Sequence, residues 1–275
     1  MAVNPRKLVN GVVFGIFVVA LLLPTLFFFF WMISLSLKPD ADNLAYPPVF
    51  IPSGLTINSY RTVFEASPFA RYALNSLIVA LGATSLSLLL GVPAAYGIAR
   101  SGRYGAALFI LVARMTPALS YLIPWFLLFQ RIGLSNTYLA LILTHLIIGL
   151  PLIIWIMIGF FEDVHRELED AAVIDGCSRF GSFLRVAVPL VRPGIAVAGI
   201  LAFIFSWNNF IFAVVLAGPR LQTLPVAIFN VLTFEQINWG PLAAAALLVT
   251  TPVLILAVTV QRHIVAGLAS GGLKG

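Results

Sequence analysis

Residues 162–192 read EDVHRELEDAAVIDGCSRFGSFLRVAVPLVR, a long polar stretch in an otherwise apolar chain. The stretch holds six of the ten acidic residues: Glu162, Asp163, Glu167, Glu169, Asp170 and Asp175. It also holds four arginines: Arg166, Arg179, Arg185 and Arg192. A charged side chain at the centre of a bilayer costs about 2.5–3.5 kcal/mol on the insertion scale. This segment, called the polar loop below, is therefore expected outside the bilayer, between two membrane spans.

The composition of the chain is that of a polytopic membrane protein. Of its 275 residues, 61% are hydrophobic and 9% are charged, and the mean hydropathy is +1.04. Soluble domains carry roughly 25% charged residues. The net charge of +6 comes from basic residues that flank apolar runs, which favours membrane topology over nucleic-acid binding. The single cysteine, Cys177, excludes an intramolecular disulfide and gives no support to a metal site built on several cysteines.

Six apolar runs are long enough to cross the bilayer as helices, which takes about 20 residues each. They are Gly11–Leu37, Tyr72–Ala99, Tyr104–Gln130, Ile132–Phe161, Pro193–Pro219 and Gln236–Gln261. Only the third contains a charged residue, Arg114. The first run is about twice as long as a signal-peptide core and ends in bulky Trp31 and Met32, so we expect a retained span. The predicted fold class is an all-α membrane protein with six transmembrane helices.

The distribution of Lys and Arg predicts the orientation of these spans. With the N-terminus inside, ten basic residues lie in inner segments: Arg6, Lys7, Arg100, Arg103, Arg166, Arg179, Arg185, Arg192, Arg262 and Lys274. Five lie in outer segments: Lys38, Arg61, Arg71, Arg131 and Arg220. The positive-inside rule then predicts that both termini and the polar loop lie in the cytoplasm.

Two outer segments are longer than tight turns. Lys38–Arg71 is rich in Pro, Asn and Ser, and we expect an ordered loop on the membrane surface. Leu221–Gly240 is mildly apolar, and three interpretations stay open for it: a partly re-entrant loop, a surface for an external partner, or a plain connection.

Inside the polar loop, the pattern predicts a short helix over Arg166–Ile174 that ends at Gly176. A second short helix is expected over Arg179–Val188. The Ala171-Ala172 pair is small enough for a partner surface to approach the backbone closely. We interpret the first helix as a knob that docks into another protein; a solvated charged loop is the alternative.

Residues 167–194 resemble the EAA loop of bacterial ABC-importer permeases. The family pattern of an acidic residue, two alanines, a glycine and a Leu/Val-Pro pair is matched by Asp170, Ala171, Ala172, Gly176 and Val188-Pro189. Three further stretches are similar to the maltose-permease type of carbohydrate importer: SLSLKPDAD (34–42), PPVFIPSGLTINSYRTVF (47–64) and QRHIVAGLASGGLKG (261–275).

The resemblance implies a type I ABC importer permease fold with a cytoplasmic coupling helix that meets an ATP-binding subunit. The residues implied in that contact are Glu169, Asp170, Ala171, Ala172, Asp175 and Gly176. Asp170 stands where the family has Glu, and Glu169 or Glu167 is expected to share its role. The tail residues implied to reach the ATPase subunits are Gly271, Gly272 and Lys274. Those implied to contact the binding protein are Phe234, Gln236, Asn238 and Trp239.

The expected organisation has three parts: 1–71 with the first span and outer loop, a permease domain over 72–263, and a cytoplasmic tail over 264–275. The implied partners are a second permease subunit, two ATP-binding subunits, an external binding protein and a sugar, polyol or glycoside. The chain itself is expected to be no enzyme and to bind no cofactor, because Gly267 and Gly272 have P-loop spacing but Leu273 follows instead of lysine. ATP and Mg²⁺ would be bound by the partner subunits.

Several polar residues fall within the predicted spans. Trp207, Asn208, Asn209 and Phe210 offer amides and aromatic faces, as a sugar requires, and are candidates for the substrate path. Hydrogen bonds between helices are the alternative role. For His145 we expect a hydrogen-bonded core position.

Two other classes of protein compete with an importer permease. An ion-coupled secondary transporter predicts acidic residues within spans, and no Asp or Glu lies in a predicted span. An intramembrane enzyme needs a cluster of catalytic groups, and the sequence suggests no partner for His145 in the membrane.

Overall fold

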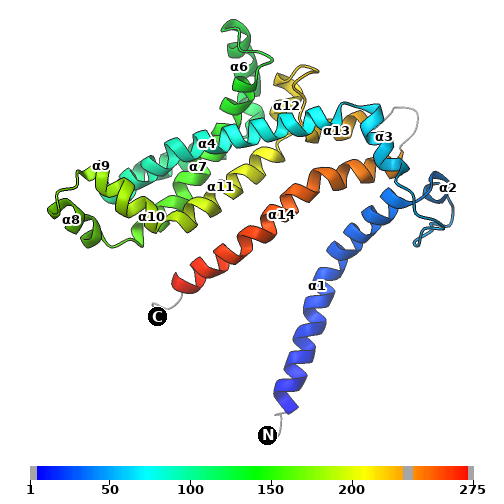
Figure 1. Cartoon of the computed structure of the whole chain (residues 1–275), viewed down its shortest axis with the longest axis horizontal. Coiled ribbons are helices and arrows are strands. Elements are labelled where there is room, and N and C mark those ends of the chain that lie inside the picture. The colour runs from blue at the N-terminus through cyan, green and yellow to red at the C-terminus, as the bar shows by residue number, and fades with distance from the viewer. Residues whose placement is uncertain (1–4, 232–237, 272–275) are drawn as a thin grey trace. The chain divides into compact units, whose positions relative to one another are not determined.

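The computed structural model describes residues 5–231 and 238–271, and every regular element within them is a helix (Figure 1). The first part contains α1 Pro5–Leu37, α2 Asp40–Asn43, α3 Asn58–Ala66, α4 Phe69–Ser101, α5 Tyr104–Met115, α6 Ala118–Arg131 and α7 Tyr138–Glu162. The polar loop contains α8 Arg166–Ile174, α9 Arg179–Ser182, the π-helix η1 Phe183–Ala187 and α10 Val188–Leu190. The remaining helices are α11 Arg192–Trp207, α12 Ile211–Leu216, α13 Leu224–Val231 and α14 Trp239–Gly271.

Among the residues that the structure describes, four helices are long and apolar enough to cross a membrane by themselves. These candidate spans are Gly11–Leu37, Phe69–Ser101, Tyr138–Glu162 and Trp239–Thr259. The number reaches six if each of two bent helix pairs is counted as one span: Tyr104–Met115 with Leu119–Arg131, and Arg179–Leu190 with Arg192–Trp207. The prediction of an all-helical membrane fold is confirmed on this count.

Two of the predicted spans are not continuous helices, so the prediction is wrong for them. Tyr104–Gln130 divides into α5 and α6, which are bent by 89°. The break lies at Pro117, which has no amide hydrogen and favours an extended residue before it; Thr116 accordingly has ψ 124°. The fifth predicted span, Pro193–Pro219, divides into α11 and α12.

The chain forms two compact units: Met1–Pro68 with Ile228–Val249, and Phe69–Ala227 with Thr250–Gly275. The core of the second unit lies where α4, α7 and α11 pack against one another (Figure 1). Ile153, Met157 and Phe161 of α7 are fully buried in it. Small side chains on α4 and α11, such as Ala95 and Ala198, allow these helices to approach closely.

A hydrogen-bonded cluster ties the N-terminal part of α4 to its neighbours. Asn75, buried in α4, donates to the carbonyl oxygens of Arg220 and Gln222 at 3.0 and 2.8 Å. Its Oδ1 accepts from the Tyr138 hydroxyl at 2.7 Å. Because unpaired polar groups are costly in hydrocarbon, these bonds fix the loop before α13 to α4 and α7.

The first unit is organised around Lys38, which directly follows α1. Its side chain is buried, donates to the Val49 carbonyl oxygen and lies 4.2 Å from the centre of the Trp31 ring. Burial lowers the pKa of the Lys38 ammonium. Nearby, the Ser53 amide donates to Asp42 at 2.7 Å and lowers the pKa of that carboxyl. The predicted outer loop is therefore internally bonded and contains two helices, α2 and α3.

Replacing Gly91 with leucine should destabilise the second unit. A Cβ at this position would lie 2.8 Å from Cγ2 of Ile153, which is fully buried and has no room to move. Overpacking of this kind costs about 1–3 kcal/mol. We expect a lower melting temperature in detergent, measured by fluorescence-detected gel filtration.

Gly97→Leu is the matched control, because Gly97 lies on the same helix and a Cβ there meets nothing within 4 Å. Its melting temperature should stay at or above that of the unaltered protein, since leucine is the better helix former. Equal melting temperatures for the two variants would contradict the close packing of α4 on α7.

Candidate functional site

Helix α8 covers Arg166–Ile174, the range predicted from the sequence, and it ends as predicted at Gly176. Gly176 has φ +94°, a conformation that glycine adopts without steric cost. The amide of Gly176 donates to Val173 at 3.1 Å, and that of Cys177 donates to Ala172 at 2.9 Å. These two bonds form a Schellman motif, which gives the last turn of α8 a defined end.

The second predicted helix, Arg179–Val188, is present in a different form. It divides into α9, the π-helix η1 and α10, and it extends to Leu190. Ser178 begins it by accepting a hydrogen bond from the Gly181 amide at 3.0 Å. The Ser182 hydroxyl donates to the Glu169 carbonyl oxygen at 3.2 Å and so joins this segment to α8.

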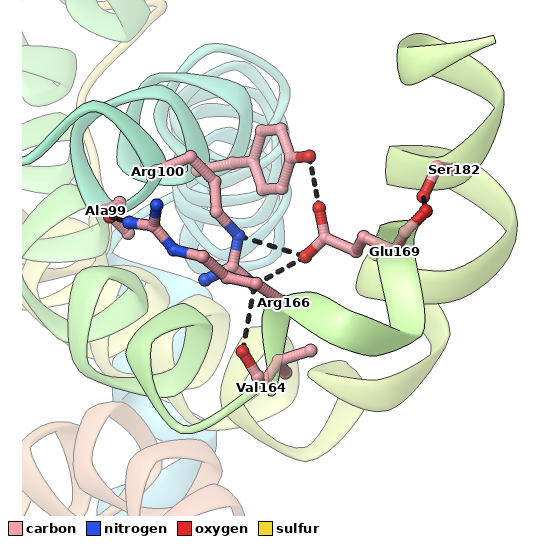
Figure 2. Close-up of polar contacts among 7 residues, drawn as sticks. Ala99, Arg100, Val164, Arg166, Glu169 and Ser182 are labelled. Carbon is pink, nitrogen blue, oxygen red and sulfur yellow. Dashed lines mark hydrogen bonds and ion pairs between the residues drawn. The ribbon is translucent and has the colours of Figure 1, made fainter. Parts of the chain in front are cut away.

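Glu169 is the one buried residue of α8, at 7% exposure, and its carboxylate is bound by the last turns of α4 (Figure 2). Nε and Nη2 of Arg100 both donate to its Oε1, the first at 2.9 Å. The Tyr96 hydroxyl donates to the other oxygen, Oε2. We call Tyr96, Arg100 and Glu169 the anchor cluster.

The anchor cluster continues into the backbone and into an aromatic contact. Nη2 of Arg100 also donates to the Val164 carbonyl oxygen at 3.1 Å (Figure 2). The Tyr96 ring lies 5.3 Å from that of Phe161 on α7 and 4.7 Å from that of Phe183 in η1. Removing one partner of a buried ion pair costs about 3–5 kcal/mol, so the cluster holds α8 firmly on α4.

Two residues of this cluster, Tyr96 and Arg100, were not predicted as functional residues. The available signal was weak, because an arginine at the end of an apolar run is ordinary membrane topology. Glu169 was predicted to touch an ATPase subunit, whereas the structure gives its carboxylate partners within its own chain.

The side of α8 next to the buried Glu169 is exposed. Asp170, Ala171 and Asp175 are exposed, and Ala172 is half-buried. Large apolar side chains are exposed beside them, with Ile174 at 85% and Phe180 at 69%. Exposed apolar groups next to a carboxylate without an ion pair in the described structure are typical of a surface that another protein covers.

A polar cavity of about 200 Å³ lies beside the anchor cluster. Arg166, Asp170 and Arg179 line it together with the three anchor residues. The guanidinium of Arg166 donates to the Ala99 carbonyl oxygen at 3.4 Å, which adds a second bond between α8 and the last turn of α4 (Figure 2).

The family model of the inner membrane components of binding-protein-dependent transport systems matches residues 87–270. The chain belongs to this family. It is therefore an ABC-importer permease, a multi-pass transport subunit of the inner membrane and not an enzyme. Membership also decides against an ion-coupled transporter.

Three curated permeases illustrate the similarity. The sulfoquinovosyl glycerol transport permease SmoH of Agrobacterium fabrum is 38% identical over 93% of this chain and 91% of its own. The trehalose transport permease SugB of Mycobacterium tuberculosis is 38% identical over 92% and 93%. The diacetylchitobiose uptake permease DasC of Streptomyces coelicolor is 33% identical over 98% and 99%.

The fold is similar to that of a solved ABC importer. A chain of a bacterial ABC transporter that imports the acidic polysaccharide alginate has a TM-score of 0.74 and 22% identity, over 95% of this chain and 98% of that one. A chain of an alginate transporter in complex with its pentasaccharide-bound periplasmic protein has a TM-score of 0.60 at 17% identity, over 92% and 95%.

The substrate-path candidates lie at the break between α11 and α12. Trp207 is buried and stacks on Phe203 at 5.6 Å. Asn208 ends α11 and donates to the Ile204 carbonyl oxygen at 3.0 Å, while Oδ1 of Asn209 accepts from the Phe212 amide at 3.3 Å. Both amides thus bond to backbone. Phe210 is half-buried, and contact of these four residues with substrate stays a prediction.

Two other intramembrane polar residues have partners inside the bundle. Nδ1 of His145 lies 2.7 Å from the Ser206 hydroxyl, in agreement with the expected core position. The Arg114 guanidinium lies 5.8 Å from the centre of the Phe205 ring, a cation–π contact between α5 and α11.

Several candidate residues fall outside the described residues: Phe234, Gln236, Gly272 and Lys274. Gly271 is the last residue of α14. Asn238 and Trp239 are exposed, Trp239 by 46%, so both are open to contact.

Replacing Gly176 with alanine should loosen the end of α8. A residue with a side chain pays about 1–2 kcal/mol for a left-handed backbone, so the Schellman bonds should open more often. We expect faster trypsin cleavage after Arg179 in the purified permease. Gly159→Ala is the control, because Gly159 is an exposed glycine of α7 with nothing within 4 Å of its Cβ position. Equal cleavage of the two variants would argue against this role of Gly176.

Proposed function

We propose that this permease moves a sugar, polyol or glycoside inward through an ATP-driven importer. Its partners would be a second homologous permease, two ATP-binding subunits that hold ATP and Mg²⁺, and an external substrate-binding protein. Transport would proceed by alternating access, with α8 as the coupling helix.

The observation that carries the proposal is the preformed exposed side of α8. Its C-terminal end is fixed by the Schellman motif, and Ser178 fixes the start of the next helix, α9, so little conformational entropy is lost when a partner binds. Asp170 is exposed for an ion pair with a basic side chain of an ATPase subunit, and Ile174 and Phe180 offer apolar area beside it. Asp170, Ala171, Ala172, Asp175 and Gly176 thus remain the proposed contacts.

The substrate class rests on the relatives. Three are permeases for a sulfoquinovosyl glycerol, for trehalose and for diacetylchitobiose, all of them glycosides. The family is defined by dependence on a binding protein. Exposed Asn238 and Trp239 are proposed to take part in that contact.

The second permease is proposed to cover apolar surface of the second unit. A groove of about 820 Å³ lies between α4, α11 and α14, lined by residues such as Leu81, Phe203 and Ile255. An apolar groove can hold either a neighbouring helix or lipid chains. The type I architecture favours a helix of the second permease.

Reversing the charge of Asp170 should uncouple the importer. In proteoliposomes with the co-purified ATPase subunits, Asp170→Lys should reduce ATP-driven sugar uptake at least about tenfold, a loss of about 1.4 kcal/mol of coupling free energy. Asp170→Glu should retain uptake. The probes are radiolabelled trehalose, diacetylchitobiose and sulfoquinovosyl glycerol, each with a binding protein that retains it.

Asp40→Lys is the control, since it reverses an exposed acid outside the polar loop. Unchanged uptake with Asp170→Lys would remove Asp170 from the interface. Uptake by the permease without any ATPase subunit would contradict the proposed function as a whole.

Both termini and the polar loop are proposed to be cytoplasmic. In a Cys177→Ser background, a cysteine at exposed Glu167 should react with a membrane-impermeant maleimide in inverted vesicles only. A cysteine at Ile51, 79% exposed in the outer loop, should react in right-side-out vesicles only. The reverse pattern would overturn the orientation.

A further inference from the structure

The buried side of α8 is unusual because its single buried residue is a carboxylate. Leu168, Val173 and Ile174 are apolar and yet 50%, 41% and 85% exposed. A helix that only needed to pack on α4 would bury its apolar side chains and leave its acids exposed. Acidic residues are almost never fully buried unless they are paired. The contact between α8 and α4 is therefore made by directed polar bonds.

Directed bonds fix orientation in a way that apolar packing does not. Arg100 presents a planar guanidinium with two donors to one carboxylate oxygen, and the Tyr96 hydroxyl binds the other oxygen. Glu169 is thereby held by two side chains that lie about one helical turn apart on α4. Rotation or sliding of α8 on α4 would break these bonds together.

The alternative mechanical route is the backbone on either side of α8. Three residues, Asp163–His165, connect α8 to α7, and four, Asp175–Ser178, connect it to α9. The first connection is itself bound by Arg100 through the Val164 carbonyl oxygen. The first connection thus leads to the end of α4, which packs along α7 and α11. The second leads to α9, whose Ser182 hydroxyl donates back to the Glu169 carbonyl oxygen.

We infer that the anchor cluster transmits the displacement of α8 to α4, so that the two helices move as one body. Tyr96, Arg100 and Glu169 are then positioning residues for transport, and the neighbouring Asp170 is the contact with the ATPase. This inference rests on the proposed function, because it needs a partner that moves α8.

The test compares the permease alone with its complex in proteoliposomes. In Glu169→Gln and Arg100→Gln, the ATPase subunits should still co-purify and hydrolyse ATP, because the exposed side of α8 is unchanged. Sugar taken up per ATP hydrolysed should fall at least about tenfold. In the permease alone, amide hydrogen exchange over residues 167–174 should accelerate. The exposed Arg103, three residues beyond Arg100, provides the control Arg103→Gln, which should change neither quantity.

The exchanged pair, Arg100→Glu with Glu169→Arg, should recover at least half of the uptake per ATP, and it keeps the test decisive if the single variants fail to fold. An unchanged ratio in the single variants would overturn the inference. So would loss of ATPase co-purification in a folded variant, because the cluster would then serve docking, or an exchanged pair that hydrolyses ATP without uptake. Absence of ATP-driven uptake in the unaltered complex would instead contradict the proposed function. Faster amide exchange over residues 167–174 in the single variants would still show that the anchor cluster holds α8 on α4.

Discussion

The ion pair between Arg100 and Glu169 is the contact on which the position of the polar loop depends. It lies at one end of α4, and the Asn75 cluster lies 25 residues earlier on the same helix. At 1.5 Å per residue the two are roughly 37 Å apart, somewhat more than the hydrocarbon thickness of about 30 Å. Polar bonds therefore fix α4 near both ends, and apolar packing on α7 and α11 occupies the length between them.

The continuous spans were predictable because the absence of charge is a local property. The broken ones were not, since hydropathy reports solubility in lipid and says nothing of helix direction. Proline does not decide the matter either. Pro93 and Pro151 lie inside continuous helices, α4 and α7, whereas Pro117 separates α5 from α6 by 89°. The difference lies in the neighbours: α4 and α7 are packed along their length, while no buried residue other than Ala107 holds α5.

In the candidate site, too, the local features were predictable from the sequence and the long-range contacts were not. Gly176 and the bounds of α8 follow from residues within one helical turn of each other. The roles of Glu169 and Asp170 do not, because adjacent residues on a helix point about 100° apart and only one of them meets α4. Arg100, which is 69 residues away in sequence, binds Glu169 and so determines which of the two acids is buried. A sequence pattern identifies both acids, but only the folded chain separates the inward carboxylate from the exposed one.

The break after α11 bears on where the substrate is selected, because the predicted substrate-path residues lie there. A helix that ends within the bilayer leaves backbone groups to be satisfied, and Asn209 accepts a hydrogen bond from one of them, the Phe212 amide. The Asn208 side chain adds a second bond to the Ile204 carbonyl oxygen, which already accepts from the Asn208 amide. In each amide the backbone uses one bonding group, so fewer donors and acceptors remain there for a sugar hydroxyl. Selection by an external binding protein does not depend on these amides, so a permease can keep them for helix continuity while its partner discriminates among solutes.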